Sequence, residues 1–177
     1  MESFIGRPEN EAGRTAREIR SYDFLDGLNI EYMRTDHPPA DTMDVCQARA
    51  AVLNTRICTN LFVCNRQETD VYLLVMPADK QFKTSVVSKQ LGVSRLHFAG
   101  EEYMEKFLDI HPGSVSILGL MNDKGNRVRL LVDKDILKQE EFACHPCVNT
   151  TSLKFKTCEL FEKVIPAMNH EPFFVEL

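Results

Sequence analysis

The sequence predicts an α+β fold, a single domain with a mixed, mainly antiparallel sheet flanked by helices. The chain has 177 residues, of which 27% are charged and 44% hydrophobic, and this length and balance suit one globular core without disulfide or metal staples. Segments with helical spacing of apolar residues are interleaved with short segments of strand character. The connections are short and none resembles a linker, so we expect one domain over residues 1–177.

Helices are expected where apolar residues recur every three or four positions. These segments are residues 10–28, 41–53, 84–91 and 101–108, and a closing helix that begins at Thr157. Gly27 and Gly92 end the first and third of them. Asp41 or Thr42 caps the second, and Pro166 should kink the closing helix or end it early.

Strands are expected at residues 32–36, 56–64, 71–76, 96–98, 115–121 and 127–132. Residues 56–64 are mostly apolar on both faces, which predicts a buried strand, and residues 71–76 are its expected antiparallel partner. The segment 122–126 reads Asn-Asp-Lys-Gly-Asn. These turn residues predict that 115–121 and 127–132 form a hairpin.

Several function classes lose support from the sequence. The chain has no apolar run of the roughly 18 to 20 residues that a membrane span requires, and its polar start, with four Glu and four Arg in residues 1–20, is unlike a targeting peptide. We therefore expect a cytoplasmic protein with no membrane partner. Gly-rich phosphate loops, nucleophile elbows and zinc-protease spacings are missing, so no cofactor is expected.

Six cysteines are present, and without a secretory signal they are expected to be reduced thiols packed as small apolar groups. The alternative is metal or redox chemistry at Cys144 and Cys147, a C-x-x-C pair that encloses His145. A structural zinc site would need a second ligand pair, which the sequence lacks. We predict no metal site.

Positive charge is concentrated in one part of an acidic chain. Residues 45–100 carry seven bases and three acids, a local charge of +4, while the rest of the chain sums to −9. Residues 80–97 hold Lys80, Lys83, Lys89 and Arg95 with no acid. This segment favours contact with a polyanion, and a solvated helix face would account equally well for the charge alone.

The ordered set of short motifs resembles a known family. The motifs are HPPADT at 37–42, CTNLF at 58–62, PADK at 77–80, SKQLG at 88–92, PGSVS with LGLMND within 112–123, HPCVNT at 145–150 and HEP at 170–172. In this order they resemble the freestanding YbaK/PrdX-type aminoacyl-tRNA deacylases, which are related to the insertion domain of bacterial prolyl-tRNA synthetase. The resemblance covers about residues 20–172.

The resemblance implies a function and a mechanism. The reaction would be hydrolysis of the ester between a wrong amino acid and the 3′-terminal ribose of a tRNA, most plausibly alanine on proline tRNA. Backbone groups of the loop 113–117 and the 2′-hydroxyl of the substrate would place the attacking water. Positioning and electrostatic preorganisation would then supply most of the rate, without a metal or cofactor and without DNA as a partner.

The resemblance also assigns site residues. The catalytic candidates are Asn60, Gly113, Ser114 and His145; the substrate-binding candidates are His37, Pro38, Thr42, Thr59 and Asn149; the tRNA-binding candidates are Lys80, Lys83 and Lys89.

Two positions depart from the family pattern. Thr59 stands where the family has a lysine, and Ile117 stands where relatives often have proline. The missing ammonium leaves an alternative open, namely a catalytically weakened or inactive relative that binds tRNA or regulates. An unrelated Cys/His metal or thiol protein is the third hypothesis.

Overall fold

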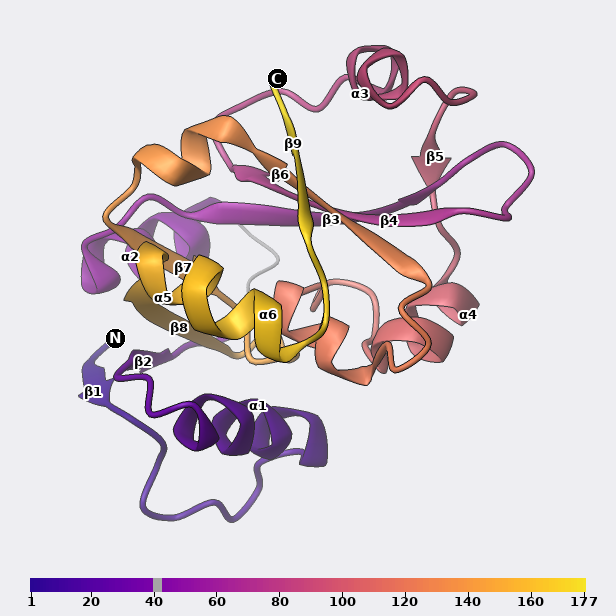
Figure 1. The fold of residues 1–177 in the computed structure, drawn as a ribbon. Coiled ribbons are helices and arrows are strands. Elements are labelled where there is room, and N and C mark those ends of the chain that lie inside the picture. Colours follow the sequence, from indigo (N-terminus) through magenta and orange to yellow (C-terminus); the bar gives the residue numbers. More distant parts are fainter. Residues whose placement is uncertain (40–42) are drawn as a thin grey trace.

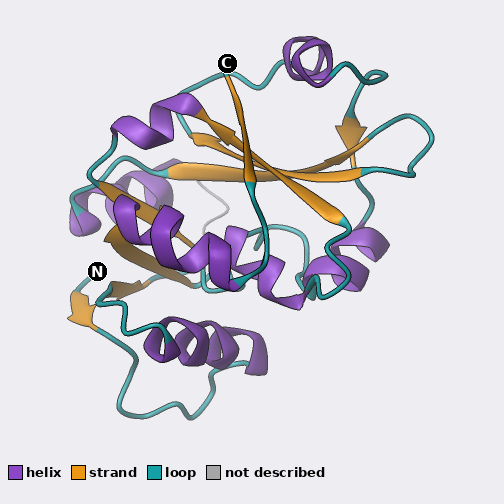
Figure 2. Ribbon diagram, in the orientation of Figure 1, coloured by secondary structure: helices purple, strands orange, loops and turns teal. Residues whose placement is uncertain are grey.

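The strands of the molecule divide between two sheets. The structure is a computed structural model that describes residues 1–39 and 43–177. One sheet has four strands in the order β1-β2-β8-β7, and the other has five in the order β5-β3-β4-β6-β9. Figures 1 and 2 show helices around both sheets, with α3 and α1 at opposite ends of the molecule. The predicted α+β class is confirmed, with two sheets in place of one.

The smaller sheet is entirely antiparallel. Its strands are β1 (Ser3–Ile5), β2 (Met33–Asp36), β7 (Glu141–Cys144) and β8 (Thr151–Lys156). Helix α1 (Ala16–Gly27) buries Tyr22 and Leu25. It begins later than residue 10 because Gly13 has a left-handed φ of +83°, and because the hydroxyl of Thr15 accepts the N–H of Glu18 as an N-cap.

The larger sheet is mixed. Its strands are β3 (Cys58–Cys64), β4 (Val71–Pro77), β5 (His97–Phe98), β6 (Val128–Asp133) and β9 (Pro172–Val175). Strands β3 and β4 form the predicted antiparallel pair, whereas β6 lies parallel to both β4 and β9. Every residue of β4 is buried, because one of its faces joins the main core and the other joins a second cluster beneath α3 (Thr84–Leu91).

The predicted hairpin of residues 115–121 and 127–132 is wrong. Residues Ile117–Asn122 form a 3-10 helix, η2, whose first five residues are buried, and β6 has parallel partners instead. Gly119 packs so closely that an added Cβ would lie 2.5 Å from Ile110 Cδ1. The carboxylate of Asp123 then accepts the N–H groups of Arg127 and Val128 and directs the chain into β6. A continuous apolar run does not distinguish a strand from a buried helical segment.

The other predicted helices are present. They are α2 (Met43–Leu53), α3, α4 (Glu101–Tyr103) continued by the π-helical η1 (Met104–Leu108), and a closing segment made of α5 (Thr157–Glu159), η4 (Leu160–Val164) and α6 (Ile165–Ala167); a 3-10 helix, η3 (Lys134–Lys138), was not expected. Gly92 ends α3 in the left-handed conformation, and the closing segment ends just after Pro166. The expected caps of α2, Asp41 and Thr42, lie outside the described residues. None of the described helices is long and apolar enough to cross a membrane.

Candidate active site

The loop 113–117 is held from two sides by residues distant in sequence. Asn60 on β3 accepts the N–H of Ile117 through its Oδ1 at 2.9 Å. The hydroxyl of Ser116 donates to the carbonyl oxygen of His145 at 2.6 Å. An added Cβ on Gly113 would lie 3.8 Å from Asn149 Nδ2. Four of the expected site residues, Asn60, Gly113, His145 and Asn149, are therefore gathered around one loop.

The backbone of this loop offers hydrogen-bond donors. Gly113 has φ +84°, a conformation that suits glycine, and the N–H of Ser114 donates to His111. No hydrogen bond among the described residues uses the N–H of Val115 or Ser116. Unused backbone N–H groups in a fixed loop are suited to donate hydrogen bonds to an ester oxygen on which negative charge develops.

His145 is held as a neutral ring of one tautomer. Its Nε2 lies 3.0 Å from Nη1 of Arg49, and because a guanidinium only donates, Nε2 must accept. The proton therefore sits on Nδ1, which donates to the carbonyl oxygen of Thr151 at 2.8 Å. Burial lowers the pKa of His145 to about 4, and the nearby charges of Arg49 and His37 add to the effect. Both ring nitrogens are engaged, so this arrangement favours a positioning role over that of a free general base.

Arg49 is a site residue that the sequence reasoning missed. It projects from α2, is only 7% exposed, and also donates to Ser152 Oγ at 3.4 Å. Its Nε is buried without a hydrogen-bond partner, and no ion pair to it is found within residues 1–39 and 43–177. The sequence does contain a signal for Arg49: it lies one helical turn before the apolar Leu53, so the two share a face of the helix, and a charged residue on the inward face indicates a buried polar contact.

His37 borders the same cluster. Its ring centroid lies 6.0 Å from that of His145. Its Nδ1 lies 2.8 Å from the carbonyl oxygen of Pro38, and its Nε2 lies 2.9 Å from Ser152 Oγ. Burial lowers the pKa of His37, which favours the neutral ring. His37 thus lies beside His145, whose carbonyl oxygen accepts from Ser116 of the loop. Pro38 follows His37 in the chain, and Thr42 lies outside the described residues.

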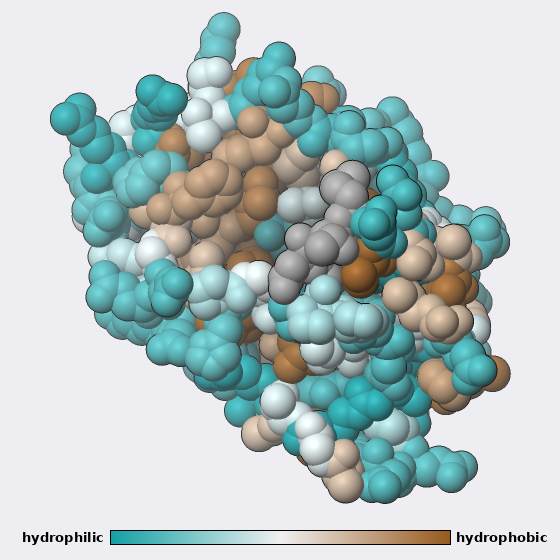
Figure 3. Space-filling model, turned by 180° about the vertical axis from the view of Figure 1, so that it is seen from behind, coloured by the Kyte–Doolittle hydropathy of each residue, from teal (hydrophilic) through white to brown (hydrophobic). Residues whose placement is uncertain are grey.

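Thr59 and two of the expected tRNA-binding lysines meet at a separate cavity. Neighbouring residues of a strand point to opposite faces, so Thr59 points away from Asn60. It lines a cavity together with Lys80, Lys83, Phe82 and other residues. Figure 3 shows apolar side chains gathered in a hollow on the rear face of the molecule, with hydrophilic residues around it.

The charge of Lys80 is compensated. Its Nζ lies 2.8 Å from Oδ1 of the buried Asp133 and 2.7 Å from Oδ2 of Asp135. Lys83 and Lys89 are exposed, and neither forms an ion pair with a carboxylate of the described residues. Of the three expected tRNA-binding lysines, Lys83 and Lys89 therefore present the more available charge.

The C-x-x-C pair is a packed part of the core. Cys144 and Cys147 are free, buried thiols, and burial raises the pKa of both, that of Cys147 to about 11. A raised pKa disfavours the thiolate that redox exchange requires, and among the described residues neither thiol belongs to a cluster of three possible metal ligands. The expectation of reduced, packed cysteines agrees with this environment.

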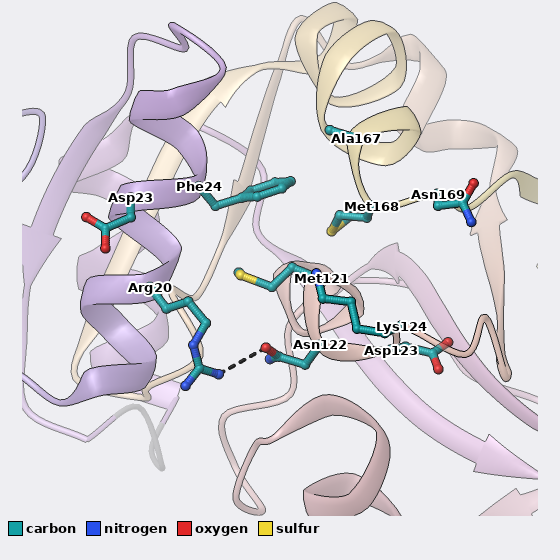
Figure 4. A pocket seen from close by; sticks show the side chains of 10 residues that line it. All are labelled: Arg20, Asp23, Phe24, Met121, Asn122, Asp123, Lys124, Ala167, Met168 and Asn169. Carbon is teal, nitrogen blue, oxygen red and sulfur yellow. Dashed lines mark hydrogen bonds between the residues drawn. The ribbon is translucent and has the colours of Figure 1, made fainter.

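Another hollow lies away from the loop. It is bordered by α1, η2 and α6, and Figure 4 shows the side chains that line it, including Phe24, Met121 and Met168. Arg20 donates to Asn122 at 2.9 Å at its edge. None of the expected site residues that the structure describes lines this hollow.

Comparison with known proteins decides the family. The model of the aminoacyl-tRNA editing domain matches residues 37–162. The chain belongs to this family. It is therefore classed with the aminoacyl-tRNA deacylases, hydrolases that act on mischarged tRNA, as the sequence predicted.

Similar proteins agree with this membership. The prolyl-tRNA editing protein ProX of Acetoanaerobium sticklandii is 28% identical over 153 residues, covering 86% of this chain and 93% of that protein. The prolyl-tRNA synthetase associated domain-containing protein 1 of Danio rerio is 24% identical, covering 85% and 82%. A crystal structure of a candidate trans-editing enzyme for prolyl-tRNA synthetase has a TM-score of 0.69 at 12% identity, covering 92% and 98%. That last likeness concerns the fold.

Proposed function

We propose that this member of the editing family removes alanine from mischarged proline tRNA in trans, by hydrolysing the aminoacyl ester. The observation that carries the proposal is the loop 113–117, which Asn60 and the His145 segment hold in place while no described residue accepts the N–H groups of Val115 and Ser116. The relatives named as prolyl-tRNA editing and prolyl-tRNA synthetase associated proteins support proline tRNA as the carrier.

In this mechanism the loop binds the reacting ester. The carbonyl oxygen of the ester accepts hydrogen bonds from the loop amides, which strengthen as negative charge develops during attack by water. The substrate's own 2′-hydroxyl and the loop backbone orient that water. Asn60 and His145 act by keeping the loop in position, because Oδ1 of Asn60 already accepts from Ile117 and the two ring nitrogens of His145 already contact Arg49 and Thr151.

The amino-acid pocket would lie between the loop 113–117 and the segment that follows β2 of the smaller sheet. His37 and Pro38 belong to this segment, and the ring centroid of His37 lies 6.0 Å from that of His145. A small pocket admits alanine and limits proline by size, although one methylene is worth only about 1 to 3 kcal/mol. We therefore expect preference for alanine with residual activity on other small amino acids, and Asn149 beside Gly113 would contact the substrate.

The tRNA would approach over the cavity that Thr59 lines. Exposed Lys83 lines this cavity together with Phe82 and Phe98. Lys89 is also exposed and lies on α3, the helix that begins just after Lys83. Exposed cations beside aromatic surface suit the phosphates and unstacked bases of a single-stranded tRNA end. Because Lys80 is paired with two carboxylates, its contribution to binding should be smaller than that of Lys83.

A deacylation assay tests the proposal. Purified protein should release alanine from Ala-tRNA(Pro) and leave Pro-tRNA(Pro) largely intact, with Ala-tRNA(Ala) as a control for the tRNA. Release rates equal to those without protein on every mischarged tRNA would reject it. Thr59 favours a second candidate, a relative that binds without hydrolysis, which would show tRNA binding in a filter assay and no release of alanine.

Lysine substitutions test the approach of the tRNA separately. Lys83→Glu with Lys89→Glu should weaken tRNA binding severalfold at low salt, and the difference should shrink as salt increases. The matched control is Lys106→Glu with Lys156→Glu, which reverses two exposed lysines elsewhere. Equal weakening by both double variants would show that only net charge matters.

A further inference from the structure

Three potential metal ligands meet at the far end of β3, away from the loop 113–117. Cys64 ends β3 and faces His97 of β5 directly in the antiparallel pair. Glu68 lies in the turn between β3 and β4 with a left-handed φ of 56°. The Cys64 Sγ, one carboxylate oxygen of Glu68 and one ring nitrogen of His97 all lie within 4.8 Å of one another. Four residues of strand, roughly 13 Å, separate Cys64 from Asn60.

The distances fit a tetrahedral zinc ion. Cys64 Sγ lies 3.3 Å from His97 Nε2, and Glu68 Oε1 lies 3.5 Å from the same nitrogen. Zinc bonded to sulfur and nitrogen at tetrahedral angles sets them about 3.6 Å apart, and nitrogen and a carboxylate oxygen about 3.4 Å apart. The Cys64 sulfur and the Glu68 carboxylate oxygen lie within 4.8 Å of each other, so they would need to approach by at most about 1 Å to share a zinc ion, which the half-exposed side chain of Glu68 can supply.

The arrangement differs from a nucleophile relay. In a Cys-His-acid relay the thiol meets one ring nitrogen and the acid meets the other, so that the ring passes a proton between them. Here the thiol and the carboxylate both converge on Nε2 of His97. Three donor atoms within 4.8 Å of one another are instead typical of ligands around an ion.

The surroundings support the same interpretation. Tyr103 donates its hydroxyl to Glu68 Oε2 at 3.0 Å, and such outer contacts orient ligating carboxylates. Cys64 is buried, whereas the side chains of His97 and Glu68 are 46% and 49% exposed. A water could therefore complete the coordination from the solvent side.

The sequence predicts no metal site, because these three residues form no short ligand motif; from the geometry we propose that Cys64, Glu68 and His97 form a site for a divalent transition metal of the zinc type, with water as the fourth ligand. The ion joins the β3–β4 turn to β5, which is only two residues long and pairs with β3 at two positions. Phe98 follows His97 and lines the cavity that contains Thr59. The bound metal thus holds the aromatic border of that cavity in place.

Metal titration of the full chain tests the site. After chelator treatment in a phosphine reductant, the protein should bind one equivalent of Zn²⁺ in isothermal titration calorimetry, with a rise in melting temperature. Co²⁺ should give a sulfur-to-cobalt charge-transfer band in the near ultraviolet and the strong visible bands of a tetrahedral site. Cys64→Ser should abolish the charge-transfer band, and His97→Ala should weaken Zn²⁺ binding at least tenfold.

Matched variants keep the test decisive. Glu68→Gln changes an exposed carboxylate and should weaken Zn²⁺ binding without affecting folding. His111→Ala removes the histidine of a comparable exposed pair, in which Nδ1 lies 2.9 Å from Glu105, and Cys158→Ser removes an exposed thiol; neither should alter binding. The proposal is overturned if the parent protein binds no equivalent of Zn²⁺, or if Glu68→Gln and the two controls bind alike.

Discussion

Replacing Asn60 by alanine should release the reactive loop. The Oδ1 of Asn60 is the acceptor for the N–H of Ile117, at 2.9 Å, and Ile117 is fully buried. Removing the acceptor leaves a buried donor without a partner, which costs about 1 to 3 kcal/mol. If that cost falls on the catalytically ordered loop, kcat/KM for Ala-tRNA(Pro) should fall about tenfold to hundredfold.

Two measurements together check this reasoning. Deacylation kinetics report the loss of rate, and amide hydrogen exchange should show faster exchange at Ile117 in Asn60→Ala. Asn122→Ala is the matched control, because its side-chain amide donates to the Leu108 carbonyl at 2.8 Å at the other end of η2. The reasoning is refuted if exchange at Ile117 is unchanged, or if Asn122→Ala lowers the rate as much as Asn60→Ala.

Three further predictions concern other residues. Burial lowers the folded-state pKa of His145 to about 4, so as pH drops the unfolded chain takes up a proton at this residue before the folded chain does. The free energy of unfolding should therefore fall by up to about 3 kcal/mol between about pH 6.5 and 4. Plots of this free energy against pH for the parent and for His145→Gln should converge in this window, and parallel plots would contradict the prediction. Thr59 is half-buried at the cavity containing Lys83, so Thr59→Lys should fold with little loss of melting temperature and raise deacylation severalfold; strong destabilisation would reject this placement. His170 Nε2 lies 3.0 Å from Asp123 Oδ2 with both side chains almost fully buried. His170→Ala removes this hydrogen-bond partner and should cost about 1 to 3 kcal/mol in urea unfolding; the same substitution at exposed His111 is the control, and equal losses would count against the buried pair.

Apolar spacing, glycines and turn residues in the sequence correctly predicted the helices and strands that depend mainly on residues close to one another in the chain. Helix α3 has a regular apolar spacing and a glycine at its end, and β3 and β4 are joined by a short polar turn; all three are found as expected. The η2 helix was mistaken for a strand because its burial depends on Leu108 and Ile110, which the periodicity of residues 117–121 does not encode. The parallel pairing of β6 with β4 and β9 likewise joins distant segments.

The candidate site shows the same division. Motif order directed attention to Asn60, Gly113, His145 and Asn149, and the structure brings these four around one loop. Arg49 was counted only as one base in a positive segment, since its contact with His145 spans 96 positions. The roles of Ser116 and Ser152 also depend on contacts between elements that no short motif contains. Residue types can be predicted from motifs, whereas buried hydrogen-bond partners require the packed structure.

The adjacency of Thr59 and Asn60 constrains how a tRNA end could be bound. These neighbours point to opposite faces of β3, so the loop that Asn60 holds and the cavity with Lys83 lie on opposite sides of the same strand. Strand β5 pairs with β3 only at Val63 and Cys64, which leaves the first part of β3 without a β5 partner. An aminoacylated end that reaches the loop while its phosphates contact Lys83 must therefore cross the β3 edge near residues 59–61. A cation at position 59 would lie where the tRNA end crosses the strand. We therefore expect the absence of this cation to lower the rate of deacylation more than the stability of the fold.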